Sequence, residues 1–205
     1  MINVQRSSEK VFHLRERKRE NMRIEPVRYD FNGHTLVFRS AEKKDAEILL
    51  PYLKRVCGET RFLLREADEC KELTVEQEEA FISSHAECER ACLILAELDG
   101  EYIGNASFDT AGASRRNAHR ADIGIALYLD YTGMGIGTKL FSLVMETVRK
   151  CGFESAELTV VEGNDRAIHL YQSFGFTETG RIPNANKYDD GTYADDIFMV
   201  KTLQD

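Results

Sequence analysis

Residues 132–138 read TGMGIGT, a turn with glycine at every second position that leads into a helical pattern. A strand that enters such a turn before a helix gathers unpaired backbone N–H groups and the positive helix end around one point, where a phosphate binds well. The alternative interpretation is a flexible turn before a helix. Two commoner phosphate-loop fingerprints fail, because Thr138 stands where a Walker loop counted from Gly133 needs glycine, and Leu140 where a dinucleotide fingerprint counted from Gly135 needs Gly or Ala. ATP and NAD are therefore disfavoured as ligands.

A second pattern, Asn-x-x-Ala-x-x-x-Tyr-x-x-x-Gly-Phe, runs from Asn164 to Phe176. With the glycine turn, in which Thr132 stands where Arg or Gln is usual, it makes the chain resemble the GNAT superfamily of N-acetyltransferases over roughly residues 36–203. The resemblance implies an α+β fold with a mixed, mostly antiparallel central sheet, splayed at an acyl-CoA site, and helices on both faces. Because Thr132 lacks a long side-chain donor, we expect cofactor affinity below that typical of the family.

The resemblance also implies acetyl-CoA as co-substrate, with no metal. The backbone expected to hold the pyrophosphate is that of Gly133, Met134, Gly135, Ile136, Gly137 and Thr138. The pantetheine would lie alongside Leu127, Tyr128 and Leu129, pairing like an added strand. Asn164 would hydrogen-bond the pantetheine arm, and Tyr171 would face the thioester sulfur.

Transfer to an amine needs a base, since an amine with a pKa of ~10.4 is almost fully protonated at neutral pH. Asp122, on the expected strand before the glycine turn, is the candidate base, or the end of a water chain; an exposed strand acid is the equally weighted alternative. His119 is a second candidate base. A backbone N–H near Leu127 could hold the oxyanion. Tyr171 is the candidate acid for the departing thiolate, and packing on its helix face is the alternative, whereas His169 is expected at the surface.

Hydrophobic periodicity predicts the elements that position these residues. Strands are expected over 35–38, 91–98, 101–110, 121–129, 157–161, 176–182 and 194–201, and helices over 43–55, 75–89, 139–150 and 164–174. Asp99-Gly100 predicts a two-residue hairpin turn. Along 121–129, the alternation predicts that Leu129 lies on the apolar face and Tyr128 on the opposite face. Pro51 is expected to kink the first helix or to end its regular part near Leu50.

The 205 residues suit one domain, with 42% hydrophobic and 30% charged residues. A net charge of −8 argues against coating nucleic acid, and no apolar run reaches the length of a membrane span. Five scattered cysteines without Cys-x-x-Cys predict free thiols in a reducing cytoplasm rather than disulfides or a zinc site. Residues 1–21 form a basic N-terminal extension without the apolar core of a secretory signal, and 22–205 a single acetyltransferase domain.

The leading functional hypothesis is direct acetyl transfer, in a ternary complex, to a primary amine of a small molecule such as a polyamine, amino acid or amino sugar. Alternatives are a protein N-terminal or lysine acetyltransferase, a non-catalytic acyl-CoA sensor, and a nucleotide phosphate-binding protein. Phe62, Arg65 and Glu66 lie where members of the family shape the acceptor pocket. The sequence names no acceptor and leaves the oligomeric state, including a homodimer, open.

Overall fold

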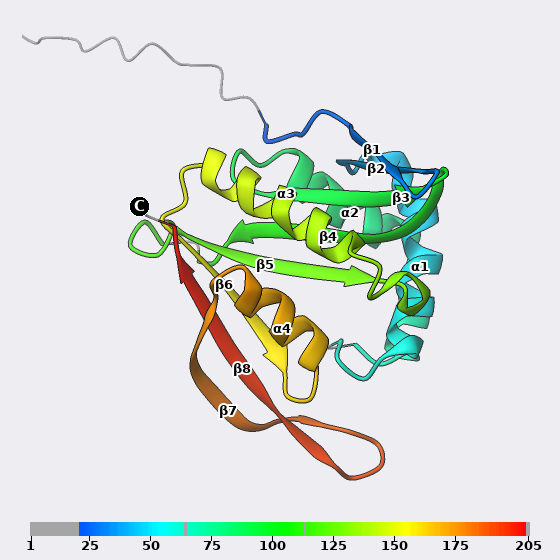
Figure 1. The fold of residues 1–205 in the computed structure, drawn as a ribbon. Coiled ribbons are helices and arrows are strands. Elements are labelled where there is room, and N and C mark those ends of the chain that lie inside the picture. The colour runs from blue at the N-terminus through cyan, green and yellow to red at the C-terminus, as the bar shows by residue number, and fades with distance from the viewer. Residues whose placement is uncertain (1–20, 64, 113, 204–205) are drawn as a thin grey trace, which may run out of the picture.

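The computed structural model describes residues 21–63, 65–112 and 114–203, so residues 1–20 of the predicted extension lie outside the described residues. These ranges build one eight-stranded sheet in the order β1-β2-β3-β4-β5-β6-β8-β7 (Figure 1). Neighbouring strands are antiparallel except β5 and β6, which run parallel. This confirms the predicted α+β fold with a mixed, mostly antiparallel sheet.

The elements follow the predicted order. The strands are β1 (Val27–Phe31), β2 (His34–Ser40), β3 (Cys92–Leu98), β4 (Glu101–Thr110), β5 (Arg120–Leu127), β6 (Ser155–Val161), β7 (Thr177–Lys187) and β8 (Tyr193–Thr202). The helices are α1 (Ala46–Glu59), α2 (Val75–Ala86), α3 (Ile136–Lys150) and α4 (Asp165–Ser173), with short 3-10 turns η1 (Lys43–Asp45), η2 (Glu69–Glu72) and η3 (Leu129–Tyr131). The predicted hairpin is confirmed, since Asp99 and Gly100 join β3 to β4 with φ of 52° and 85°.

The edge strand β1 was not among the predicted strands. It pairs with β2 through a tight turn at Asn32 and Gly33, whose φ angles are 53° and 83°. Asn-Gly is the dipeptide that best suits a two-residue hairpin turn, because both positions need positive φ. That dipeptide was the available sequence signal for this hairpin.

Two local predictions need correction. Helix α1 continues through Pro51 to Glu59, so Pro51 does not end it near Leu50, and buried neighbours such as Leu49 and Tyr52 hold it against the core despite the missing N–H donor. Strand β5 ends at Leu127, and the chain then turns into η3. As a result Leu129 is 53% exposed and does not lie on the apolar face, whereas Tyr128 is 8% exposed and packs in the core on the opposite face of the sheet, as predicted.

Helices cover both faces of the sheet, each over its own apolar core. On one face, α3 and α4 contribute side chains such as Phe141 and Tyr171 to a cluster with alternate residues of the central strands. On the other face, α1 and α2 contribute side chains such as Tyr52 and Ile82. Strand β3 supplies both cores, with Ile94 facing the first and Leu95 the second, as the two-residue period of a strand requires.

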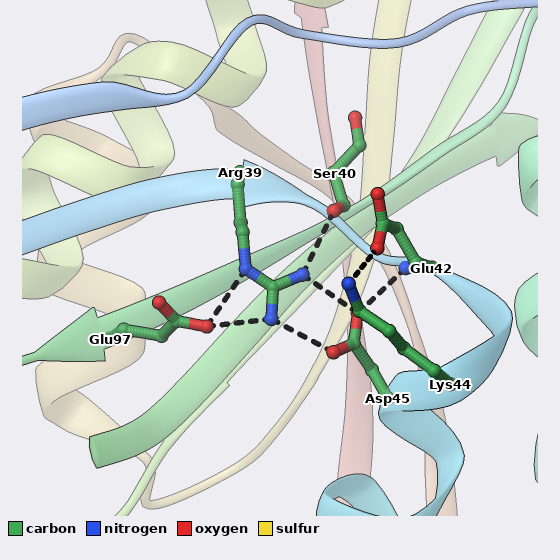
Figure 2. A network of polar contacts seen from close by, with 6 residues as sticks. All are labelled: Arg39, Ser40, Glu42, Lys44, Asp45 and Glu97. Atoms are coloured by element: carbon green, nitrogen blue, oxygen red, sulfur yellow. Dashed lines mark hydrogen bonds and ion pairs between the residues drawn. The ribbon is translucent and has the colours of Figure 1, made fainter. Parts of the chain in front are cut away.

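A partly buried charge network fixes the start of α1 to the sheet (Figure 2). The Arg39 guanidinium donates to both carboxylate oxygens of Asp45 at 2.7 and 2.8 Å, and its Nε donates to Glu97 on β3 at 2.8 Å. Burial alone would raise the pKa of Asp45, but hydrogen bonds from Arg39 and the Glu42 backbone outweigh it and lower that pKa. The network therefore positions helix α1, which also contacts the end of β5.

No helix in the described ranges is long and apolar enough to cross a membrane.

Candidate active site

Strands β5 and β6 separate soon after they begin. Their parallel register joins residues 120–122 to residues 155–157 and goes no further. Bonds from Ala111 N to Arg120 O and from Tyr128 N to Ile103 O show that even-numbered residues of β5 bond to β4. Because bonding direction alternates along a strand, Ile123, Ile125 and Leu127 direct their N–H and C=O groups toward β6, across the splay. An extended amide ligand could pair with this edge as an added strand.

The glycine turn lies where this edge ends. Gly133 and Gly135 have φ of 78° and 87°, and α3 begins at Ile136 with no side-chain cap on its first turn. Ile136 is fully buried, so its side chain anchors the helix start while the backbone N–H groups of the first turn stay available. A Cβ built on Gly133 or Gly135 would meet nothing within 4 Å, so the space beside the turn is open. This arrangement fits a pyrophosphate.

Arg166 lies beside Thr132, which stands where the motif usually has a long side chain. Its guanidinium, at the start of α4, donates to the hydroxyl of Thr132, which in turn donates to Leu129 O at 2.7 Å. A guanidinium is a strong partner for a phosphate. The sequence prediction of weakened cofactor affinity, which stays a prediction, took no account of this residue, because the two positions are 34 residues apart.

The pantetheine was predicted to lie alongside Leu127, Tyr128 and Leu129. In the structure the backbone N–H groups of these residues differ in their hydrogen-bond partners. Tyr128 N donates to Ile103 O at 3.0 Å, and Leu129 N donates to Glu59 Oε2 at 2.8 Å. Their N–H groups are thus already bonded within the protein. Of the three, Leu127 is the residue whose N–H faces the splay.

The two predicted α4 residues are firmly fixed. Asn164 is the N-cap, and its side-chain oxygen accepts from Ala167 N at 3.3 Å, which leaves the amide NH₂ to serve a ligand. Tyr171 is 6% exposed and packs against Phe141 with ring centroids 5.3 Å apart. Burial raises the pKa of Tyr171 to about 12, so the phenol keeps its proton at neutral pH. His169 is exposed, as predicted.

Asp122 lies in the paired part of β5, directly across the ladder from Asp109 on β4. Loss of part of its water shell raises the pKa of Asp122, and the charge of Asp109 adds to the shift, although the residue still reaches solvent. His119 is exposed and precedes the strand, further than Asp122 from the glycine turn.

A buried histidine supports this acidic pair, and the sequence prediction missed it. His85 on α2 is 3% exposed; its Nε2 lies 2.9 Å from Asp109 Oδ2 and its Nδ1 lies 3.0 Å from Phe81 O. A carbonyl oxygen only accepts, so Nδ1 donates to Phe81 O, and Nε2 forms an ion pair with the Asp109 carboxylate when the ring is protonated. Burial alone would lower the pKa of His85, but the bonds to Asp109 and Phe81 raise it overall.

The segment between α1 and η2 crosses the outer end of the splay; we refer to its residues 60–63 as the strap. Arg61 stacks on Tyr188 at 3.6 Å and donates to Thr192 at 2.9 Å, both at the tip of the β7–β8 hairpin. Phe62 lies beside Gly163 in the β6–α4 turn. Of the residues predicted to shape the acceptor pocket, Phe62 therefore meets the splay, whereas Arg65 and Glu66 are exposed.

The chain belongs to the GNAT acetyltransferase family, whose model matches residues 60–176. This span includes both motifs, the splay and the strap.

Among curated proteins, the chain is 28% identical over 114 residues to the L-amino acid N-acyltransferase MnaT of Escherichia coli, covering 55% of this chain and 65% of that protein. It is 26% identical over 114 residues to the L-methionine sulfoximine/L-methionine sulfone acetyltransferase of Salmonella typhimurium, covering 55% and 66%. The match thus spans about two thirds of each relative.

Among solved structures, a GNAT acetyltransferase from Streptococcus pneumoniae has a TM-score of 0.77 and 31% identity, covering 82% of this chain and 99% of that one. YncA from Salmonella typhimurium, solved with its cofactor acetyl-CoA, has a TM-score of 0.73 and 20% identity, covering 83% and 95%. The second likeness concerns the fold alone. Within the described ranges, no group of three or more His, Cys, Asp or Glu side chains could hold a metal ion.

Proposed function

We propose that the protein is an acetyl-CoA-dependent N-acetyltransferase acting on the primary amine of a small molecule, with free amino acids the favoured class. The observation that carries this proposal is the continuity of the free β5 edge at Ile125 and Leu127 with the uncapped start of α3. An extended amide arm that ends in a phosphate matches both features. When bound, acetyl-CoA supplies the activated acetyl group.

The chain's own residues would then divide three tasks. The N–H of Leu127 donates to the oxyanion, the phenol of Tyr171 donates a proton to the departing thiolate, and the amine proton leaves toward Asp122. Leu127 lies five positions after Asp122, which is about 17 Å along a strand. Asp122 therefore acts as the end of a water chain and not by direct contact.

The acidic pair supports the choice of base. Loss of part of its water shell raises the pKa of Asp122, and the charge of Asp109 opposite it adds to the shift; a carboxylate with a raised pKa is a better proton acceptor. His85 pairs with Asp109 at 2.9 Å.

The curated relatives support a small acceptor, because both are named for acyl transfer to amino acids or their close analogues. The strap also supports it, since Arg61 ties the α1 side of the splay to the β7–β8 hairpin and narrows the approach from that end. We further propose that residues 22–205 act as one domain.

Thermal unfolding with acetyl-CoA, CoA, ATP and NAD tests the cofactor. A ligand at ~100 times its dissociation constant adds about 2.7 kcal/mol, a rise of several degrees for a domain of this size. CoA release with the twenty amino acids, polyamines, amino sugars and short peptides then tests the acceptor. A rise with acetyl-CoA but no turnover of any amine would favour the acyl-CoA sensor, and turnover of peptides alone would favour a protein acceptor.

A further inference from the structure

Two of the five cysteines meet at the ends of the segment that carries the strap. Cys57 lies in the last turn of α1 and Cys70 lies in η2, and their sulfur atoms are 2.6 Å apart. Both thiols are free and both residues are buried, at 6% and 0% exposure. A sulfur pair this close is near the separation of a covalent S–S bond, so the two sulfur atoms need to move little to form one.

From this geometry we propose that Cys57 and Cys70 form a reversible disulfide, which would close a loop of chain that contains the strap. The sequence prediction of free thiols rested on the scattered spacing of the cysteines, whereas the fold brings these two together.

The reaction needs an oxidant, and a small disulfide such as oxidised glutathione balances it. One protein thiolate attacks the oxidant, forming a mixed disulfide and releasing one reduced thiol. The second protein thiolate then attacks the protein sulfur of that mixed disulfide, forms the Cys57–Cys70 bond and releases a second reduced thiol. Two S–H bonds are lost, one S–S bond is exchanged, and the two electrons pass to the oxidant.

The environment makes this exchange slow while the segment stays packed. Burial and the neighbouring Cys70 thiol raise the pKa of Cys57 to about 12, so its thiolate is scarce at neutral pH. Oxidation should therefore accelerate as the pH is raised. The resulting bridge should also be slow to reduce, because it is shielded from an attacking thiolate.

The bridge would act on the strap. Gly58, next to Cys57, lies close to the part of the segment that leads to Cys70: a Cβ built on Gly58 would lie 3.8 Å from Ala67 Cβ. The far end is held by Arg61, which stacks on Tyr188, and Phe62 lies beside Gly163. A covalent tie between Cys57 and Cys70 would thus limit opening of the segment that borders the outer end of the splay.

A tryptic peptide map detects the bond directly. Cleavage after Arg55, Arg61, Arg65 and Lys71 places the two cysteines on separate peptides, 56–61 and 66–71. The full-length chain is reduced, freed of reductant, incubated with oxidised glutathione at pH 8.5, alkylated, unfolded and mapped without reduction. We expect peptides 56–61 and 66–71 to be joined, the intact chain to be about 2 Da lighter than the reduced chain, and dithiothreitol to reverse both changes.

Matched variants define the site. Cys57→Ser and Cys70→Ser should each abolish the joined peptide, while Cys151→Ser, which alters a thiol outside the pair, should leave it intact. Free thiols in both peptides after prolonged oxidation of the wild-type chain, or bonding of either cysteine to another partner, would overturn the proposed bond. This map requires neither acetyl-CoA nor turnover, so it is independent of the proposed enzymatic function.

The effect on the strap is tested on the folded chain. Native trypsin cleavage after Arg61 and Arg65 should be at least about fivefold slower for the oxidised chain than for the reduced chain, because cleavage requires local opening. The difference should vanish in Cys70→Ser. Equal cleavage of the oxidised and reduced wild-type chains would overturn the claim that the bond holds this segment.

Discussion

Replacing Gly104 by alanine should damage the cofactor site from the neighbouring strand. Gly104 on β4 pairs with Leu127, the last residue of β5, at a φ of 157°. An added Cβ would lie 2.5 Å from Ala126 O and 2.8 Å from Leu127 Cα. Both contacts are with backbone, so the end of β5 must move rather than a flexible side chain.

The size of the effect follows from these contacts. Overpacking in a well-packed region costs roughly 1–3 kcal/mol, and an unfavourable backbone conformation costs a similar amount. We expect Gly104→Ala to lower the free energy of unfolding by about 2–4 kcal/mol. Displacement of Leu127 should also weaken acetyl-CoA binding about tenfold or more, because the N–H that faces the splay shifts with it.

Urea unfolding and calorimetric titration with acetyl-CoA measure the two effects. Gly124→Ala is the matched control: Gly124 lies on β5, and its added Cβ would meet only Ser107 Oγ at an ordinary 3.5 Å. The control should retain stability within about 1 kcal/mol and normal affinity. If Gly104→Ala behaves like Gly124→Ala in both assays, the close approach of β4 and β5 does not position the cofactor edge.

Four further substitutions probe single groups. Arg166→Ala should raise the dissociation constant for acetyl-CoA about tenfold in calorimetry, and an unchanged constant would remove Arg166 from the anion site. Tyr171→Phe should lower kcat and leave acetyl-CoA affinity nearly unchanged; equal loss of both would assign the ring to packing. The raised pKa of Asp122 places the acid limb of the pH–rate profile above the usual aspartate value of ~3.9, and Asp122→Asn should abolish that limb, whereas an unaltered profile would relocate the base. Asp45→Asn should destabilise the fold by about 3–5 kcal/mol in urea, since it leaves Arg39 without its main partner. The pKa of Asp45 is lowered on folding, so its contribution in the wild type is present at neutral pH and fades as the pH falls below ~3.9, whereas the variant should lack this dependence.

Local patterns in the sequence predicted most of the elements of the fold. The hydrophobic periodicity and the Asp99-Gly100 turn each depend on a few neighbouring residues, and the structure confirms the elements that they predict. Leu129 was misplaced because alternation was extended beyond the end of β5, where the chain enters η3. Nothing in the alternating pattern itself marks that end.

The site was less predictable because several of its groups meet only through long-range contacts. Arg166 reaches Thr132 across two elements, and His85 reaches Asp109 from a different layer of the fold. Neither pair has a fixed spacing that a motif could record. The motif residues Gly135 and Tyr171, by contrast, were found from sequence, because their local backbone and helix positions are encoded by their neighbours.

Steady-state release of CoA from acetyl-CoA in the presence of individual L-amino acids tests the proposed function most directly. We expect turnover with at least one free amino acid, formation of its N-acetyl product by mass spectrometry, and loss of both in Gly135→Val, whose side chain would obstruct approach to the turn. Tight binding of acetyl-CoA without turnover of any small amine would contradict the assignment of this site to acetyl transfer.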